Sequence, residues 1–353
     1  MAKFAHMSDI HLDSPFDYLD LDNKKDERRS EQRITFKNSI ELADNSNCDF
    51  VVISGDLFDG EIADISTIKY IDEVFSMHED MKFVLISGNH DLVNNNNLIY
   101  SYKFKSKNVF VLSNEKPSII INDVKIYCEL HDELDNNYYN ILMWHGDVNE
   151  SGQENPLPSI YKRVGFDYIA LGHIHQFEDH SNEVSKIYYP GSLIARGFDE
   201  LGKKGFLLVE CNKENSKVSF VEVEQRIYIN EFIDVSSIDY ENVLSLANEI
   251  SKRIVNPRNI YKFTLIGNRN SSTKINKIYL KSELANKAFH IKVKDETKFN
   301  ETKELSLIEK EFVNKIDELI KKASTSEEKE KYQLAKAIGL KAFKDEVIFD
   351  EDM

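Results

Sequence analysis

The stretch that decides the fold is Phe50-Val51-Val52-Ile53-Ser54-Gly55-Asp56-Leu57-Phe58-Asp59, in which an apolar run is followed directly by glycine and acidic residues. Short runs rich in Val, Ile and Phe are typical of strands that are buried on both faces of a sheet. The same order recurs along the chain, and the predicted strands are 3–7, 50–54, 82–87, 140–144 and 166–171. Each of them ends in polar residues, so the side chains suited to chemistry fall on loops at strand ends.

Helical spacing fills the gaps between these strands. One predicted helix covers 30–44 with a buried stripe of Ile34, Ile40 and Leu42, and another covers 64–77 with Ile65, Ile68, Ile71, Val74 and Phe75. Further strands are predicted at 186–189, 205–210 and 218–224. We therefore expect an α/β fold, a β-sandwich flanked by helices, with its ligands bound at the strand ends.

Five polar clusters follow the five predicted strands. They are Asp9-Ile10-His11, Gly55-Asp56-Leu57-Phe58-Asp59, Gly88-Asn89-His90-Asp91, His145-Gly146 and Gly172-His173-Ile174-His175. Carboxylate, imidazole and amide groups suit Mn²⁺, Fe²⁺ or Zn²⁺. Taken singly, a strand-end Asp is usually a turn former and a His is usually a satisfied polar group. Five such clusters in order reduce the odds of coincidence to about a per cent or less.

The clusters resemble the signature of the calcineurin-like metallophosphoesterases, which is D-x-H, G-D-x-x-D, G-N-H-[DE], H and G-H-x-H. The resemblance covers roughly residues 1–200. It implies two divalent cations that activate water for attack on phosphorus. Under this resemblance one cation is held by Asp9, His11, Asp56 and His175, and the second by Asp56 as a bridge with Asn89, His145 and His173.

The resemblance also implies two catalytic residues outside the ligand set. His90 would protonate the leaving oxygen or stabilise the charge that develops on it, and Asp59 would orient His90.

Within the family, further motifs resemble the SbcD/YhaO-like branch of DNA repair nucleases. They are residues 11–16 (HLDSPF), residues 33–36 (RITF), and residues 189–192 (YPGS) with Arg196 after them. This branch implies a Mn²⁺-dependent DNA exo- or endonuclease subunit that acts with an SbcC-like coiled-coil ATPase. Arg196 is the predicted substrate contact because guanidinium matches phosphate geometry, although a salt bridge to an acidic neighbour is the plain structural alternative.

The remainder of the chain changes character after the predicted phosphoesterase domain, 1–224. Residues 225–300 predict a small α/β capping domain, with strands at 226–235, 261–266 and 277–280 and a helix at 240–254. Residues 301–353 predict a helical hairpin whose first helix has a stripe of Leu305, Ile308, Phe312, Ile316, Leu319 and Ile320. Such a hairpin either packs on its own domain or docks on the partner ATPase, and the sequence gives the two alternatives about even weight.

Net charge and amino-acid composition limit the kinds of partner and cellular location that we expect for this protein. The chain has 353 residues and a formal net charge of −16, and residues 1–224 carry 22 Lys and Arg against 39 Asp and Glu. Because DNA binding needs clustered basic residues, a partner is expected to supply part of the DNA-binding surface. Cys48, Cys128 and Cys211 suggest neither a disulfide framework nor a thiolate metal site. With no signal peptide and no membrane-length apolar run, cytoplasmic localisation without membrane association is expected.

Other functions are also compatible with this sequence. A phosphatase, or a phosphodiesterase for cyclic nucleotides or other small molecules, would need no C-terminal region and would tolerate an acidic surface. A non-catalytic DNA-end scaffold is less favoured, because every ligand position is filled. A homodimer also stays open.

Overall fold

The computed structural model describes residues 1–343 apart from 18, 20–21, 61–62, 94–95, 132, 150, 153, 239–241, 270–274, 300–305 and 324. Its strands are β1 (Ala2–Met7), β2 (Phe50–Ser54), β3 (Lys82–Ile86), β4 (Leu92–Val93), β5 (Asn96–Asn97), β6 (Val109–Val111), β7 (Ser118–Ile121), β8 (Val124–Tyr127), β9 (Tyr139–His145), β10 (Tyr168–Gly172), β11 (Glu178–Asp179), β12 (Lys186–Tyr189), β13 (Gly205–Cys211), β14 (Ser216–Glu222), β15 (Tyr228–Asp234), β16 (Ile260–Ile266), β17 (Asn268–Arg269), β18 (His290–Asp295) and β19 (Lys298–Phe299). Its helices are α1 (Asp22–Asn45), α2 (Ile65–Ser76), α3 (Leu98–Ser101), α4 (Tyr161–Val164), the 3₁₀ turn η1 (Val235–Ser237), α5 (Val243–Ser251), α6 (Lys277–Leu284), α7 (Leu307–Lys322) and α8 (Ser326–Ala342).

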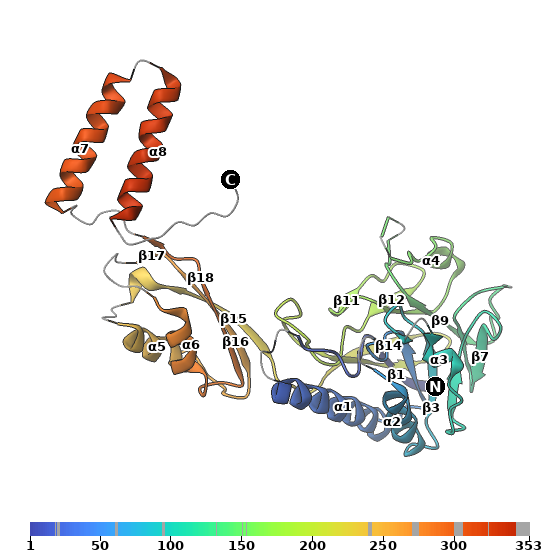
Figure 1. Ribbon diagram of the computed structural model, residues 1–353. Helices are drawn as coiled ribbons and strands as arrows, with labels where there is room; N and C mark the ends of the chain where they lie inside the picture. Colours follow the sequence, from blue (N-terminus) through green and yellow to red (C-terminus); the bar gives the residue numbers. More distant parts are fainter. Residues whose placement is uncertain are drawn as a thin grey trace.

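Two mixed sheets form the sandwich that the sequence predicts. One has the strand order β14-β13-β1-β2-β3-β6 and the other β11-β12-β10-β9-β8-β7. The central strands β1, β2 and β3 run parallel, as do β9 and β10, so their carboxyl ends meet at one edge of the sandwich. The helices α1 and α2 lie together on the outer side of the first sheet (Figure 1). The α/β fold class is confirmed.

Successive side chains along each strand point to opposite faces of the sheet, so the core consists of separate layers. On β2, Phe50 and Val52 point into the interior between the sheets, while Val51 and Ile53 pack against the helices. Since both faces of β2 are covered, its continuous apolar run is explained by burial on both sides. Another cluster, which includes Leu142 and Ile169, covers the outer face of the second sheet.

The first helix differs from its prediction. It begins at Asp22, eight residues earlier than expected, and Ile34 and Leu42 of the predicted stripe are 57% and 42% exposed. The buried side instead carries Phe36, Ile40 and Ala43. The prediction for α2 is closer: Asp64 caps its N-terminus, and of the predicted stripe only Ile65 is exposed.

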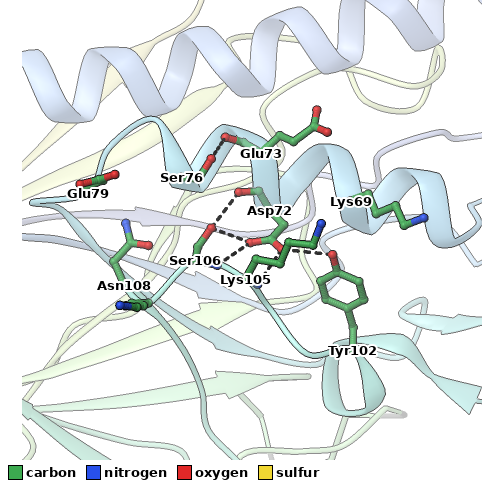
Figure 2. A pocket seen from close by; sticks show the side chains of 10 residues that line it. Lys69, Asp72, Glu73, Ser76, Glu79, Tyr102, Lys105, Ser106 and Asn108 are labelled. Carbon is green, nitrogen blue, oxygen red and sulfur yellow. Dashed lines mark hydrogen bonds between the residues drawn. The ribbon is translucent and has the colours of Figure 1, made fainter.

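A cavity of about 490 Å³ lies between α2 and the segment that follows α3. Its wall is built around Asp72, whose carboxylate accepts hydrogen bonds from the backbone N–H groups of Lys105 and Ser106 and from the hydroxyl of Tyr102 (Figure 2). Because this buried carboxylate is satisfied by its own domain, Asp72 has a structural role that fixes the segment to α2.

A third sheet, which we call the small sheet, has the parallel order β15-β16-β18. Helices α5 and α6 cover one of its faces and share a core with Ile233, Phe263 and Ile291. The strand predicted at 277–280 is wrong: these residues begin α6, because Asn276 caps the helix and Leu280 and Leu284, four residues apart, both reach the core. The strand β18 supplies the missing third strand.

Contacts with the first helix fix this sheet to the sandwich. Arg226, which is 8% exposed, forms ion pairs with Glu27 and Glu31 of α1, and its guanidinium carbon lies 3.5 Å from the ring centroid of Phe289. A buried cluster that includes Ala195 and Tyr228 adds apolar contact. A boundary at residue 224, like the one at 300, stays a prediction.

The helices α7 and α8 form a hairpin (Figure 1). Phe312 and Phe343 pack edge to face at 5.3 Å, and Lys336 pairs with Asp317 at 2.7 Å. Thr325 caps α8, and Leu305 of the predicted stripe lies outside the described residues. No helix in the part of the chain that the structure describes has the length and apolar character to cross a membrane.

Candidate metal centre

The polar clusters come together at the edge of the sandwich where the parallel strands end. Four of the predicted ligands adopt a left-handed or otherwise positive φ that is uncommon outside glycine: Asp9 (50°), His11 (47°), Asp56 (52°) and His173 (112°). Each such residue costs on the order of 1–3 kcal/mol, and strain of this kind concentrates at functional sites. The backbone therefore turns sharply here in order to aim several side chains at one point.

Asp9, His11 and His175 form one group of ligand atoms, all within 4.8 Å of one another. The Nε2 atoms of the two imidazoles are 3.1 Å apart, and His175 Nε2 is 3.9 Å from Asp9 Oδ1. His175 Nδ1 lies 2.8 Å from a carboxylate oxygen of Glu200, so Nδ1 donates to Glu200 and the Nε2 lone pair is directed into the site. Asp9 and His11 are buried.

Asp56 joins this group to a second one that contains Asn89 and His145. Its Oδ2 is 3.5 Å from His11 Nε2 and 3.3 Å from His145 Nε2. Burial raises the pKa of Asp56, but His145 and the backbone N–H of His90 outweigh burial and lower it. The carboxylate that lies between the two groups is therefore held in its charged form.

The surroundings of His145 show that the donor set fits a cation. His145 Nδ1 donates to the carbonyl oxygen of Ser54 at 2.8 Å, which leaves Nε2 facing Asn89 Oδ1 at 2.9 Å and the Asp56 carboxylate. Burial lowers the pKa of His145, but Asp56 and Asp9 outweigh burial and raise it to about 9. The two oxygens thus favour a positive charge at Nε2. A proton on Nε2 supplies that charge in the metal-free site, and a divalent metal ion bound to the Nε2 lone pair would supply it instead.

His173 is placed differently from the other predicted ligands. Its backbone N–H donates to both carboxylate oxygens of Asp9, at 2.9 and 3.1 Å. Its ring centroid is 5.6 Å from that of His145, and its Nε2 is 3.8 Å from the exposed carboxylate of Glu154. The side chain thus borders the second group, and its role as a ligand stays a prediction.

The predicted catalytic residues lie on the open side of the site. His90 is 45% exposed, and its Nδ1 is 3.9 Å from Asp59 Oδ1. Asp59 raises the pKa of His90 and burial lowers it, and the pKa is raised overall. The guanidinium of Arg196 is 3.6 Å from Asp59 and 3.1 Å from His175 Nδ1, so Arg196 lies at the rim of the same site.

Two buried carboxylates support the site and were given no role from the sequence. Asp91 accepts hydrogen bonds from the backbone N–H groups of Asp56, Leu57, Phe58 and Gly88, so it clamps together the loops that carry Asp56 and Asn89. Glu200 contacts His175 and also binds Arg196 through its backbone N–H and its Nε. The signal for Asp91 was present in Gly88-Asn89-His90-Asp91, whereas the contact of Glu200 depends on the fold.

Glycines allow the loops to come this close. A Cβ on Gly88 would lie 2.2 Å from Asp56 Oδ1, and one on Gly172 would lie 1.9 Å from the carbonyl oxygen of Ser54. The first approach brings the Asn89 loop against Asp56. The second brings the His173 loop against the carbonyl that orients His145, so both glycines are required by packing at the site.

A comparison with protein families matches residues 2–177 to the calcineurin-like phosphoesterase model. Residues 2–177 form a calcineurin-like phosphoesterase domain. The resemblance inferred from the five clusters is therefore confirmed, and this domain is that of a family of metal-dependent hydrolases.

Two curated relatives of this phosphoesterase domain extend beyond it. The chain is 25% identical over 261 residues to the uncharacterized metallophosphoesterase YhaO of Bacillus subtilis, covering 66% of this chain and 63% of YhaO. It is 27% identical over 293 residues to the DNA double-strand break repair protein Mre11 of Archaeoglobus fulgidus, covering 67% of this chain and 62% of that protein. The chain thus spans about three fifths of the length of these relatives. These similarities support the predicted SbcD-like branch.

Among solved structures, a predicted phosphoesterase from Streptococcus pneumoniae TIGR4 is similar, at 18% identity and a TM-score of 0.35, over 63% of this chain and 91% of that one.

Proposed function

We propose that this chain is a two-metal phosphodiesterase, a Mn²⁺-dependent DNA exo- or endonuclease subunit that acts with an SbcC-like coiled-coil ATPase. One observation carries the catalytic part. Carboxylate, imidazole and amide groups from separate strand ends converge on one point, with Asp56 between His11 and His145 at 3.5 and 3.3 Å. Similarity to a DNA double-strand break repair protein supports DNA as the substrate.

The ligand assignment proposed from the family pattern uses two sets of side chains. Asp9, His11, Asp56 and His175 would hold one cation, and Asp56, Asn89, His145 and His173 would hold the other. When bound, the two cations would act as Lewis acids toward the phosphate group and its nucleophile. The mixed oxygen and nitrogen donors are compatible with Mn²⁺.

The chain's own residues have distinct tasks in this proposal. Arg196 lies at the rim and would orient a non-bridging phosphate oxygen through its planar guanidinium. His90, more exposed than the ligands, would hold a proton for the leaving oxygen, and Asp59 would keep its ring oriented. Asp91 and Glu200 would position the ligand loops without touching substrate.

Removal of metal tests the proposal directly. Chelated and dialysed protein is expected to lose hydrolysis of both bis(p-nitrophenyl) phosphate and DNA, and Mn²⁺ is expected to restore both. Add-back of Mg²⁺, Zn²⁺ and Ca²⁺ at matched free concentrations is the control for metal identity. Full activity after rigorous removal of metal would contradict the two-metal model. Hydrolysis of only phosphomonoesters or cyclic nucleotides would instead support a small-molecule enzyme.

The partner proposal depends on the hairpin of α7 and α8. Among the described residues of α7 none is buried, and Leu307 and Ile308 are 87% and 69% exposed. On α8, Leu334 and Ile338 are 62% and 50% exposed. The hairpin therefore does not cover its own domain in the structure, and an apolar helical surface of this kind suits a partner helix.

Removing residues 303–353 is expected to spare hydrolysis of bis(p-nitrophenyl) phosphate and to abolish association with an SbcC-like ATPase. A sharper variant, Leu334→Glu with Ile338→Glu, places charge on the exposed surface and should give the same loss in a pull-down. Lys331→Glu, an exposed change on the same helix, is the matched control and should bind normally. An insoluble truncated protein, or unchanged binding by the double variant, would contradict docking.

A further inference from the structure

A cavity of about 530 Å³ lies beside the candidate metal centre, where the segment between β12 and β13 meets the small sheet. Its wall includes Arg196 and Phe198 from the sandwich and Lys262 and Lys292 from the small sheet. Arg196 also contacts His175 at 3.1 Å, so Arg196 is shared by the cavity wall and the rim of the centre. A substrate that extends from the metal centre past Arg196 would therefore meet the two lysines.

The pairing of the strands shows that the lysines belong to one sheet face. Lys262 pairs with Asn230 and with Lys292, while Thr264 pairs with Phe232 and with Lys294. Because side chains alternate along a strand, these two rows point away from α5 and α6, whose core contains Phe263 and Leu265. We call this surface, formed by Asn230, Phe232, Lys262, Lys292 and Lys294, the open face of the small sheet.

The charge on this face contrasts with that of the chain, whose formal net charge is −16. Lys294 is paired with Glu296 at 2.5 Å, but within the described residues no ion-pair partner is found for Lys262 or Lys292. The cavity wall also contains Asp199 and Glu200, and Glu200 is already engaged by His175 and Arg196. Lys262 Nζ lies 5.9 Å from the ring centroid of Phe198, a contact that leaves its charge without a carboxylate partner in the described chain. Two ammonium groups that form no ion pair with the described part of the protein, next to a phosphodiesterase centre, favour phosphate as their ligand.

An exposed aromatic ring accompanies the lysines. Phe232 is 69% exposed, two residues along β15 from the row that contains Lys262 and Lys292. A free phenyl face among lysines suits a nucleobase that is not paired in a duplex, since stacking contributes about 1–3 kcal/mol per base in single-strand binding proteins. The ion pairs of Arg226 with α1 hold the sheet beside the centre.

We propose that the open face of the small sheet binds a single strand of nucleic acid that leads away from the scissile phosphate, with Lys262 and Lys292 on its backbone and Phe232 on a base. This inference rests on the proposed phosphodiesterase function and specifies its substrate as an extended strand.

The test measures binding without catalysis. A fluorescein-labelled oligothymidylate of about ten nucleotides, within the usual site size of single-strand binding folds, is titrated with protein in chelator, and anisotropy is followed across a salt series. Lys262→Gln with Lys292→Gln should weaken binding on the order of tenfold and reduce the salt slope by roughly 1.4, since each phosphate contact on a single strand contributes about 0.7. Lys262→Arg with Lys292→Arg should bind like the unaltered protein.

Matched controls distinguish binding at this surface from a general effect of the protein's charge and from the proposed hydrolytic activity. Lys277→Gln with Lys281→Gln removes the same charge from exposed positions of α6, on the helix-covered side, and should bind normally. Phe232→Ala should weaken binding of the single strand and not of a duplex of equal length. Unchanged binding by the Lys262/Lys292 variant, equal loss in the α6 control, or tighter binding of duplex through these lysines would overturn the proposal. Hydrolysis of bis(p-nitrophenyl) phosphate by the unaltered protein with Mn²⁺ is scored separately, so failure of the enzyme function is distinguishable from failure of this binding surface.

Discussion

Replacing Asp56 by asparagine is expected to abolish phosphodiester hydrolysis and to lower the metal content of the purified protein. Asp56 lies between His11 and His145, and it is 1% exposed. Asparagine keeps an oxygen that can accept the backbone N–H of His90, and it tolerates the φ of 52° as aspartate does. The local fold is therefore preserved while the negative charge between His11 and His145 is lost. We expect turnover to fall by more than about 100-fold, beyond the 10–100-fold effect of losing an outer partner of a metal ligand.

Metal per chain, measured by elemental analysis after dialysis against buffered Mn²⁺, decides whether the loss acts through metal. Asp72→Asn is the matched control, because Asp72 is also a buried carboxylate of the same domain that accepts backbone N–H groups (Figure 2). This control should lower the melting temperature and leave metal content unchanged. Normal metal content in Asp56→Asn would contradict the proposed bridging role.

The fold was predictable where burial and periodicity coincide. The apolar runs that end before Asp9, Asp56 and His173 are strands whose two faces are both buried. Burial on both faces requires a continuous apolar run, and that run is visible in the sequence. The predicted stripe of the first helix was wrong because the buried side of the helix is partly polar. Arg28 and Gln32 are 0% and 1% exposed, and they donate to the carbonyl oxygens of Ala195 and His11, which lie outside the helix. Hydropathy cannot show such a face.

Short apolar segments of the small domain were ambiguous for a different reason. Lys277–Leu280 has only four residues, too few to distinguish the periodicity of a helix from that of a strand. A helix is indicated only when the neighbouring residues are included, because Asn276 caps it and Leu284 continues its apolar spacing.

The strands β7 and β8 of the sandwich were not predicted from the sequence. Ser118–Ile121 is only partly buried, so its apolar pattern is weak.

The candidate site was predictable as a list of residues and not as an arrangement. Spacing placed Asp9, Asp56 and His145 at strand ends, and the structure brings their ligand atoms within 4.8 Å of one another. What could not be inferred is the support, because the Ser54 carbonyl that orients His145 and the Glu200 that orients His175 are 91 and 25 residues away in sequence. The open face of the small sheet depends in the same way on strand pairing.

Removing the imidazole of His90 is expected to have an effect that depends on the leaving group. His90 is 45% exposed, against 25% for His175 and 6% for His145, so it faces the substrate side of the centre. Asp59 raises the pKa of His90 and outweighs burial, which favours a ring that holds a proton at neutral pH. His90→Ala should therefore cut turnover on DNA by about 10²–10⁴-fold, the scale for losing a general acid.

The deoxyribose oxygen of DNA leaves as a strongly basic alkoxide that needs this proton, whereas p-nitrophenolate is weakly basic and leaves without one. Hydrolysis of bis(p-nitrophenyl) phosphate by His90→Ala should consequently fall far less than DNA cleavage, with metal content unchanged. Asp59→Asn should give a smaller loss in the same direction, because it only weakens the hold on the ring. His78→Ala, at an imidazole paired with Asp44 away from the centre, is the control and should leave both rates intact. Equal losses on the two substrates would show that His90 stabilises charge or positions substrate instead of donating a proton, and loss of metal would place it among the ligands.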